Sequence, residues 1–290
     1  MAASDFLLEK KLRELDPELH RRFTDSVFVL HQALMKFKRL FPEYTDHSEF
    51  HSMNVINFCN TLIGEKYISH MNAHEIYVLL MSCYLHDIGM GVTPKDYEEF
   101  KDALGAEEYF KKWPDRGAAD FVRHSHHDFS GMFIRKYAQL LEIPSEEHLF
   151  AIVQTCRGHR RTDLFDENEY PVRYKVTDQD VVHLPYLAAV IRLADEVDVV
   201  ADRNPKLLYD IESLTDPYQN AHYRLLEAVP RMQIFPDRFV LDVETDDELL
   251  WLAIRELAGK MQRTLDYCRS VVEKRTPFEI SQKKVDLNRI

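Results

Sequence analysis

The chain has 290 residues, of which 45% are hydrophobic and 30% are charged, and its formal net charge is −12. The length suits one large domain or one domain with a modest appendage. The negative charge argues against binding of long nucleic acids, which needs many basic side chains to neutralise phosphates. Only eight glycines are present, so a Gly-rich phosphate-binding loop is not expected.

Neither export nor membrane insertion is predicted. The N-terminal residues lack the basic and then apolar order of a signal peptide, and the longest uncharged apolar stretch, residues 76–85, is too short to span a bilayer. We therefore expect a cytoplasmic protein with no membrane partner. Its cysteines stand in apolar helical patterns without a CxxC pair, which is typical of buried, reduced thiols. They are Cys59, Cys83, Cys156 and Cys268.

Hydrophobic residues at helical spacing predict three helices in the first third of the chain. The first covers residues 17–40 and begins with a first-turn proline. The second is expected from about residue 46 to residue 63, with Gly64 as its C-terminal stop. The third, over residues 72–87, is almost wholly apolar, which indicates a buried central helix.

The middle of the chain predicts further helices. A Thr-Pro pair opens a polar helix over residues 95–111, and helices over 118–141 and 145–157 follow. Residues 162–180 are polar and rich in turn formers, which is typical of a loop that borders a site. A further helix is expected over residues 185–201.

Two short strands, residues 231–236 and 238–245, precede a long helix over 247–273. We interpret these elements as an appendage to a helical domain. The expected fold class is therefore all-α, with a helical domain over residues 1–210 and a small β-hairpin and long helix within residues 211–290.

The pair His86-Asp87 closes the most apolar predicted helix. Leu79 and Leu80 each stand seven residues earlier, so both polar side chains leave from the core-facing side of that helix. A carboxylate in such a place needs a charged partner, and a divalent cation is one. A single His-Asp pair is more often structural, so this observation needs others beside it.

Other helices repeat the pattern of a metal-ligand side chain on an apolar stripe. The residues concerned are His51, His126, His159 and Asp195. Together with the His-Asp pair they offer four imidazoles, two carboxylates and no thiolate. This set suits one or two divalent ions among Mn, Fe, Zn, Ni and Co, and Mg less well.

The order H…HD…H…H…D on helices, carried by YLHDIGM, RHSHHDFSGMFI and AVIRLADEVD, resembles the HD-domain superfamily. The resemblance covers about residues 45–203 and is strongest to HD domains of bacterial conflict systems, which often stand beside chaperone-like ATPases. It implies hydrolysis of phosphoesters, commonly in nucleotides, and a partner ATPase. The chain lacks the Gly-Tyr-Pro signature of the HD-GYP subgroup, so hydrolysis of cyclic di-GMP is not expected.

The resemblance also implies two metal positions that share Asp87. It assigns the first to His51, His86, Asp87 and Asp195 and the second to Asp87, His126 and His159. Such cations acidify water toward neutrality and polarise a phosphoryl oxygen, so no Ser or Cys nucleophile is needed. Asp87 is therefore predicted to be both a ligand and a catalytic residue.

The run from His124 to His127 leaves the register of the second position open. We prefer His126, which stands four residues before Ser130 and seven before Phe133, and keep His127 as the alternative. His124 lies roughly 160° from His126 around the helix and is expected to face water.

Several basic residues near these ligands are candidates for binding the substrate phosphate, because a planar guanidinium contacts phosphate through two hydrogen bonds. They are Lys95, Arg123, Arg157, Arg160 and Arg161. A salt bridge or a solvated position is the alternative for each. His47 and His127 are candidates to donate a proton to the leaving oxygen, although a supporting or surface position fits them equally well. Arg192, Asp198 and Arg203 are interpreted as structural braces of Asp195.

The sequence thus predicts a metal-dependent phosphohydrolase acting on a nucleotide or a related small phosphate compound. Two alternatives differ in class: a catalytically idle or ligand-sensing regulatory module, and an HD-fold di-iron oxygenase. The intact ligand set argues against the first, and the basic residues argue against the second. A homo-oligomer is a further expectation that the sequence leaves open.

Overall fold

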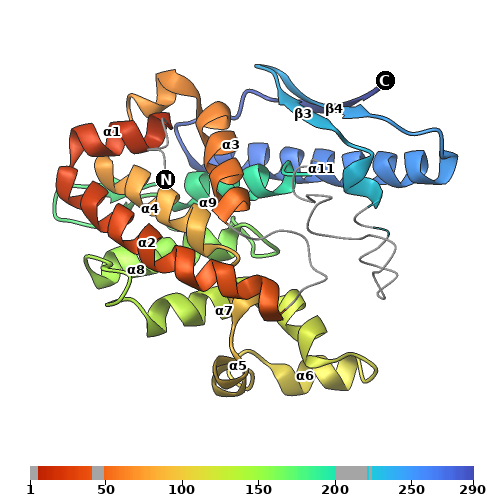
Figure 1. Ribbon diagram of the computed structural model, residues 1–290. Helices are drawn as coiled ribbons and strands as arrows, with labels where there is room; N and C mark the ends of the chain where they lie inside the picture. Colours follow the sequence, from red (N-terminus) through yellow and green to blue (C-terminus); the bar gives the residue numbers. More distant parts are fainter. Residues whose placement is uncertain (1–5, 41–48, 200–220, 222–223) are drawn as a thin grey trace.

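The computed structural model describes residues 6–40, 49–199, 221 and 224–290 (Figure 1). Helices dominate this part of the chain, as predicted, and two small β-sheets accompany them. The helices are α1 (Leu7–Leu15), α2 (Pro17–Leu40), α3 (Glu49–Ile68), α4 (Ala73–Leu85), the 3-10 helix η1 (Ile88–Gly91), α5 (Pro94–Phe100), α6 (Ala106–Lys112), α7 (Ala118–Lys136), α8 (Glu146–Gly158), α9 (Leu184–Glu196) and α11 (Glu248–Arg275).

Helix α4 is the central element of the helical part, and all its residues from Glu75 to Leu85 are buried. Asn72 caps it: the Asn72 side chain accepts the backbone N–H of Glu75, and the Glu75 side chain accepts the backbone N–H of Asn72. Helices α1, α2, α3, α8 and α9 pack around it. The His-Asp pair that follows α4 therefore emerges inside the core.

The C-terminal elements share that core. Strands β3 (Arg231–Ile234) and β4 (Arg238–Val243) form the predicted antiparallel pair, and β5 (Lys284–Arg289) adds to β4 in parallel. Helix α11 packs against β5 and α9. Residues of the sheet and of α11 belong to the same buried hydrophobic cluster as the helical bundle. The predicted domain boundary at residue 210 lies outside the described residues.

Several boundaries differ from the prediction. The polar helix expected over residues 95–111 is two helices, α5 and α6, because Gly105 adopts the left-handed conformation with φ 81°. The regular helix that begins at Glu49 is interrupted at Gly64, whose φ of 75° and ψ of 155° are not helical, so the predicted stop coincides with a kink inside α3. Helices α7 and α9 each end about five residues early. Helix α1 and strand β5 were not predicted.

The polar segment over residues 162–180 also differs from a plain loop. It contains β1 (Tyr174–Lys175), which pairs antiparallel with β2 (Val181–Val182). The hydroxyl of Thr177 donates to Asp180 Oδ2 at 2.9 Å and tightens the turn between these strands. Strands of two residues leave too short an alternating pattern to be recognised in sequence.

Helices α5 and α6 form an excursion at one end of the molecule, at the bottom of Figure 1. They pack on α7 through a hydrophobic cluster separate from the main core. Its buried members are Val92, Phe100, Ala106, Phe121, Val122 and Phe129. The wall that α6 contributes beside α7 thus rests on its own small core.

In the part of the chain that the structure describes, no single helix has both the length and the apolarity for a bilayer span. The segment Ala73–Gly91 passes that test only when joined to Pro94–Phe100 across a bend of 94°. The four cysteines are buried and free, as predicted.

Candidate metal centre

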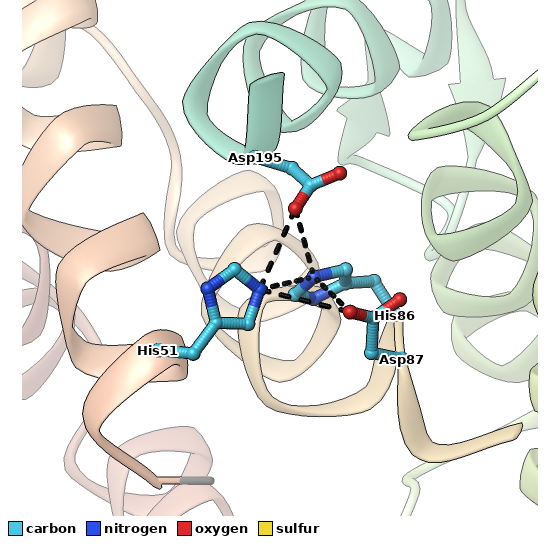
Figure 2. Close-up of side chains that lie close together, drawn as sticks. All are labelled: His51, His86, Asp87 and Asp195. Carbon is cyan, nitrogen blue, oxygen red and sulfur yellow. Dashed lines mark hydrogen bonds and ion pairs between the residues drawn. The ribbon is translucent and has the colours of Figure 1, made fainter. Parts of the chain in front are cut away.

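Four predicted ligands from three helical segments meet in one group (Figure 2). His51 Nε2 lies 3.1 Å from His86 Nε2, 3.7 Å from Asp87 Oδ2 and 3.5 Å from Asp195 Oδ1. His86 Nε2 lies 3.5 Å from Asp87 Oδ2 and 3.8 Å from Asp195 Oδ1. We call these four residues the first metal group.

The other oxygen of Asp87 belongs to a second group. Asp87 Oδ1 lies 3.3 Å from His126 Nε2 and 3.3 Å from His159 Nε2, and these two nitrogens are 3.0 Å apart. We call Asp87, His126 and His159 the second metal group. Asp87 therefore faces one group with each carboxylate oxygen, which is the arrangement that a bridging ligand requires.

The ends of buried helices position most of these side chains. His86 and His159 are the C-terminal cap residues of α4 and α8, and Asp87 precedes η1. His51 lies in the first turn of α3 and His126 in the middle of α7. The four imidazoles and Asp87 are buried, with at most 7% of each residue exposed. Water therefore competes little for these ligand atoms.

The Nδ1 atoms of three ligand imidazoles point at backbone carbonyls of their own chain segments. His86 Nδ1 donates to Cys83 O at 3.1 Å, and His126 Nδ1 donates to Arg123 O at 2.8 Å. The His159 Nδ1 donates in the same way to Cys156 O. A carbonyl only accepts hydrogen bonds, so each of these Nδ1 atoms carries the proton and each neutral ring presents a lone pair at Nε2.

The fourth imidazole has a carboxylate partner instead. His51 Nδ1 lies 2.6 Å from Asp198 Oδ2, and Asn54 Nδ2 donates to the other oxygen, Asp198 Oδ1, at 3.3 Å. Asp198 is fully buried. A carboxylate on the far nitrogen fixes the tautomer of a metal-binding histidine and makes the ring a stronger donor to the metal.

These contacts test whether a metal fits. Two ring nitrogens that both present lone pairs repel each other at the 3.0 and 3.1 Å observed here. A cation between them removes that repulsion. Two nitrogens bound to one ion at about 2.0–2.1 Å stand roughly 2.9–3.4 Å apart for bond angles between octahedral and tetrahedral. The residues present therefore fit one ion in each group.

Burial and charge keep the ligands in their metal-binding forms. Burial lowers the pKa of His159 to about 3, although the nearby Asp87 carboxylate opposes the shift. Burial acts to raise the pKa of Asp195, but contacts with His51 and His86 outweigh it and hold that pKa well below its usual range. Neutral imidazole and ionised carboxylate are the forms that bind metal ions.

A close backbone crossing sets the distance between the two groups. A Cβ atom added to Gly89, just after the His-Asp pair, would lie 2.1 Å from His126 O and 2.4 Å from Ser130 N. The Ser130 hydroxyl donates to His86 O at 2.7 Å and accepts the N–H of Gly89 at 2.9 Å. Small residues at these two positions let η1 touch α7, which brings His126 within reach of Asp87.

A pocket of about 520 Å³ adjoins the second metal group. It is lined by Tyr109, Arg116, Asp120, Arg123, His124, His127, Arg160 and Arg161. His127 and Arg160 directly follow ligands of the second group in sequence. Burial first, and then the charges of Arg161, Lys112 and Arg160, lower the pKa of His124, so positive charge is concentrated here.

The predicted phosphate-binding residues separate into two sets. Arg123, Arg160 and Arg161 line the pocket. Arg157 instead donates to Asp128 at 2.8 Å, to Gln154 at 3.0 Å and to Glu169 at 3.1 Å. Lys95 is exposed on α5 and does not line the pocket.

The remaining predicted site residues have different positions. His126 lies in the second metal group, His127 lines the pocket, and His124 is exposed at the same pocket. Burial lowers the pKa of His127 to about 4, so its imidazole is neutral near pH 7. His47 and Arg203 lie outside the described residues.

Three features of the site were missed by sequence reasoning. Asp198 contacts His51, whereas we expected it to brace Asp195; its place three residues after Asp195 was a signal for a shared face, but not for this partner. Likewise, the Arg192 guanidinium donates to Gly158 O and Thr162 O. The pocket residues Tyr109, Arg116 and Asp120 carry no recognisable motif.

Comparison with known families confirms the predicted resemblance to HD domains. The family model HD-CE matches residues 41–274. The match covers most of the chain, and the protein therefore belongs to the HD-CE family, an HD-domain family. Comparisons with curated proteins and with solved structures gave no match.

Proposed function

We propose that this protein is a metal-dependent phosphohydrolase that cleaves a phosphoester of a nucleotide or a related small phosphate compound. The observation that carries the proposal is the pair of buried His/Asp groups that share Asp87 and direct imidazole Nε2 atoms toward one another. Membership of an HD-domain family supports it.

In this proposal His51, His86, Asp87 and Asp195 hold one ion, and Asp87, His126 and His159 hold a second. Bound divalent ions supply Lewis acidity toward a phosphoryl oxygen and a water that ionises near neutral pH. In hydrolysis a P–O bond forms to the oxygen of water, and the bond between phosphorus and the leaving oxygen breaks. The leaving oxygen then receives a proton. The protein's part is to hold the ligands in place and to orient the substrate.

The adjoining pocket supports a phosphate substrate over the alternatives. Guanidinium groups from Arg123, Arg160 and Arg161 reach a space next to the second metal group. An oxygenase acting on an uncharged substrate gains nothing from such charge. Neutral His127 is suited to hydrogen-bond a substrate oxygen, and a bound phosphate would raise its pKa toward the range in which it can donate a proton.

The test combines metal analysis with a substrate panel. Protein purified without chelators is assayed for bound metals and for phosphate release from nucleoside mono-, di- and triphosphates and model phosphodiesters. We expect one to two transition-metal ions per chain and hydrolysis that disappears with chelator and returns with Mn, Fe, Co, Ni or Zn. Protein that holds no metal after gentle purification would refute the metal site. Metal-loaded protein that consumes oxygen but cleaves no phosphoester would establish the oxygenase instead.

A further inference from the structure

The pocket beside the second metal group is strongly cationic in an otherwise acidic protein. Four guanidinium groups and one carboxylate line it, although the whole chain has a formal net charge of −12. The four are Arg116, Arg123, Arg160 and Arg161. A cluster of positive charges on a protein of negative net charge raises the concentration of anions near that cluster.

These charges extend away from the metal groups and are not gathered at one point. Arg160 follows the ligand His159 directly, and the Arg123 carbonyl accepts a hydrogen bond from Nδ1 of the ligand His126. Arg116 lies in the segment between α6 and α7 and pairs with Asp120 in the first turn of α7, six residues before the ligand His126 and so about 9 Å from it along the helix axis. A ligand reaching from the metals to Arg116 would pass several guanidinium groups in succession.

Part of this charge is not neutralised by carboxylates of the described residues. Arg116 pairs with Asp120 at 3.2 Å, in an exposed contact that contributes little. Within the described residues, neither Arg160 nor Arg161 has a carboxylate partner. Arg157, one helical turn away, contrasts with them because it makes bonds to Asp128 and Glu169. The two consecutive arginines are thus available to an incoming anion.

We propose that the pocket binds a chain of two or more linked phosphates, as in a nucleoside di- or triphosphate. This inference rests on the proposed function: one phosphate lies at the metal groups, and the others contact Arg160, Arg161 and Arg116. A single phosphate carries too little charge to occupy so many guanidinium groups. The volume of about 520 Å³ suits one small molecule, and not a polymer.

The rim of the pocket offers an aromatic surface to the rest of such a ligand. The rings of Tyr109 and His124 lie with centroids 5.2 Å apart at an angle of 44°. Aromatic side chains of this kind stack on nucleobases without selecting one base over another. We therefore expect the phosphate chain to dominate affinity and the base to add less.

The experiment measures binding without catalysis. Inorganic tripolyphosphate and inorganic phosphate are titrated by calorimetry into chelator-treated, desalted protein. Tripolyphosphate should bind at least about 100-fold more tightly than phosphate, and its affinity should fall as salt rises. Arg160→Ala and Arg161→Ala should each weaken tripolyphosphate binding about tenfold. Arg135→Ala removes an exposed cation from the same helix as His126, outside the pocket, and should change nothing.

Three outcomes overturn the inference. They are equal affinity for phosphate and tripolyphosphate, unchanged binding in both arginine variants, and tighter binding of a single-stranded oligonucleotide than of a nucleoside triphosphate. Arg161→Lys keeps the positive charge but removes the planar guanidinium. It should therefore bind tripolyphosphate more tightly than Arg161→Ala and less tightly than the unaltered protein, because the ammonium group cannot make the bidentate contact. Circular dichroism checks that each variant stays folded.

The result is separable from the proposed function because no turnover is required. Tripolyphosphate binding together with a panel that shows no hydrolysis would support the phosphate-chain pocket and refute the phosphohydrolase. Hydrolysis of monophosphates by protein that does not bind tripolyphosphate would support the phosphohydrolase and refute the phosphate-chain pocket.

Discussion

The two metal groups and the arginine pocket are neighbours, but they differ in how deeply their side chains are buried and in how firmly these are held. In the metal groups every imidazole is buried and its Nδ1 is fixed by a carbonyl or by Asp198. In the pocket, Arg161 is exposed and Arg160 is half-buried, and neither is fixed by a carboxylate among the described residues. The first arrangement suits a small ion that demands fixed ligands. The second suits a flexible anion that the side chains can follow.

Their supports differ as well. Helices α3, α4, α8 and α9 carry most ligands of the metal groups and pack in the main hydrophobic core. The outer wall of the pocket comes from α6, which rests on the small separate cluster. Loss of a metal ligand held by the main core should therefore leave the outer wall of the pocket in place, although α7 carries residues of both regions. The predictions below test this separation in order of decreasing effect.

Asp87→Ala should have the largest effect, because Asp87 faces both metal groups. We expect loss of both ions and loss of hydrolysis by more than about 100-fold, above the usual cost of removing a supporting contact. Tripolyphosphate binding and helical content should persist. Asp195→Ala, which touches only the first group, should leave up to one ion bound. Metal counts by mass spectrometry would contradict the shared position if the two variants behaved alike.

Gly89→Ala should separate the two metal groups. The new methyl would clash with the α7 backbone at His126 and Ser130, so η1 and α7 must move apart at a cost of about 1–3 kcal/mol. The second ion should weaken more than the first. Gly117→Ala is the control, since no atom beyond its chain neighbours lies within 4 Å of its added Cβ. Thermal unfolding with and without metal measures both effects, and equal behaviour of the two variants would contradict the close approach.

Three histidines of α7 should mark the boundary between metal groups and pocket. His126→Ala should empty the second metal position. His127→Ala should keep the metal and lower kcat about tenfold, the worth of one hydrogen bond. His124→Ala should keep the metal and affect KM at most. Loss of metal in the His127 variant with normal loading in the His126 variant would show that the assigned register is wrong by one residue.

Asp198→Asn should weaken the first ion without touching the second. Removing the negative charge behind His51 makes its ring a poorer ligand, and we expect metal affinity to fall about tenfold. Competition with a chromogenic chelator measures this directly. Asp25→Asn, which removes an exposed carboxylate on α2, is the matched control. If the metal affinity of the Asp198 variant were unchanged, the contact between Asp198 and His51 would contribute to packing and not to metal binding.

His148→Gln should have the smallest effect and concerns a buried histidine outside both regions. Burial, and then the nearby His74 and Arg22, lower the His148 pKa to about 4, with Glu147 opposing the shift. As the pH falls, His148 is protonated in the unfolded chain before it is protonated in the folded protein. The stability that neutral His148 contributes is therefore present above about pH 6.5 and is lost as pH falls toward 4. The contribution is at most about 3 kcal/mol. Denaturant unfolding from pH 7 to 4.5 should show a shallower decline in the variant, and parallel curves would contradict the shift.

Helical periodicity explains why the residues of the two candidate metal groups could be selected from the sequence. His51, His126, His159 and Asp195 were found because each interrupts an apolar stripe, and a stripe marks the face that a helix buries. The pair after α4 was found because a buried carboxylate needs compensation. The phosphate-binding prediction was less complete, since Arg157 and Arg160 look alike in sequence although their surroundings differ.

The sequence by itself determined the mainly helical fold, the family resemblance and the side chains that point into the core, because these depend on local spacing. The family resemblance already implied that Asp87 is shared by two metal positions, and the structure supplied the distances. Only the tertiary structure decided that Asp198 lies behind His51 and that α6 closes a cationic pocket. These features depend on how helices cross. The crossings are set by packing between residues far apart in the chain, such as Gly89 against Ser130, and no local pattern encodes them.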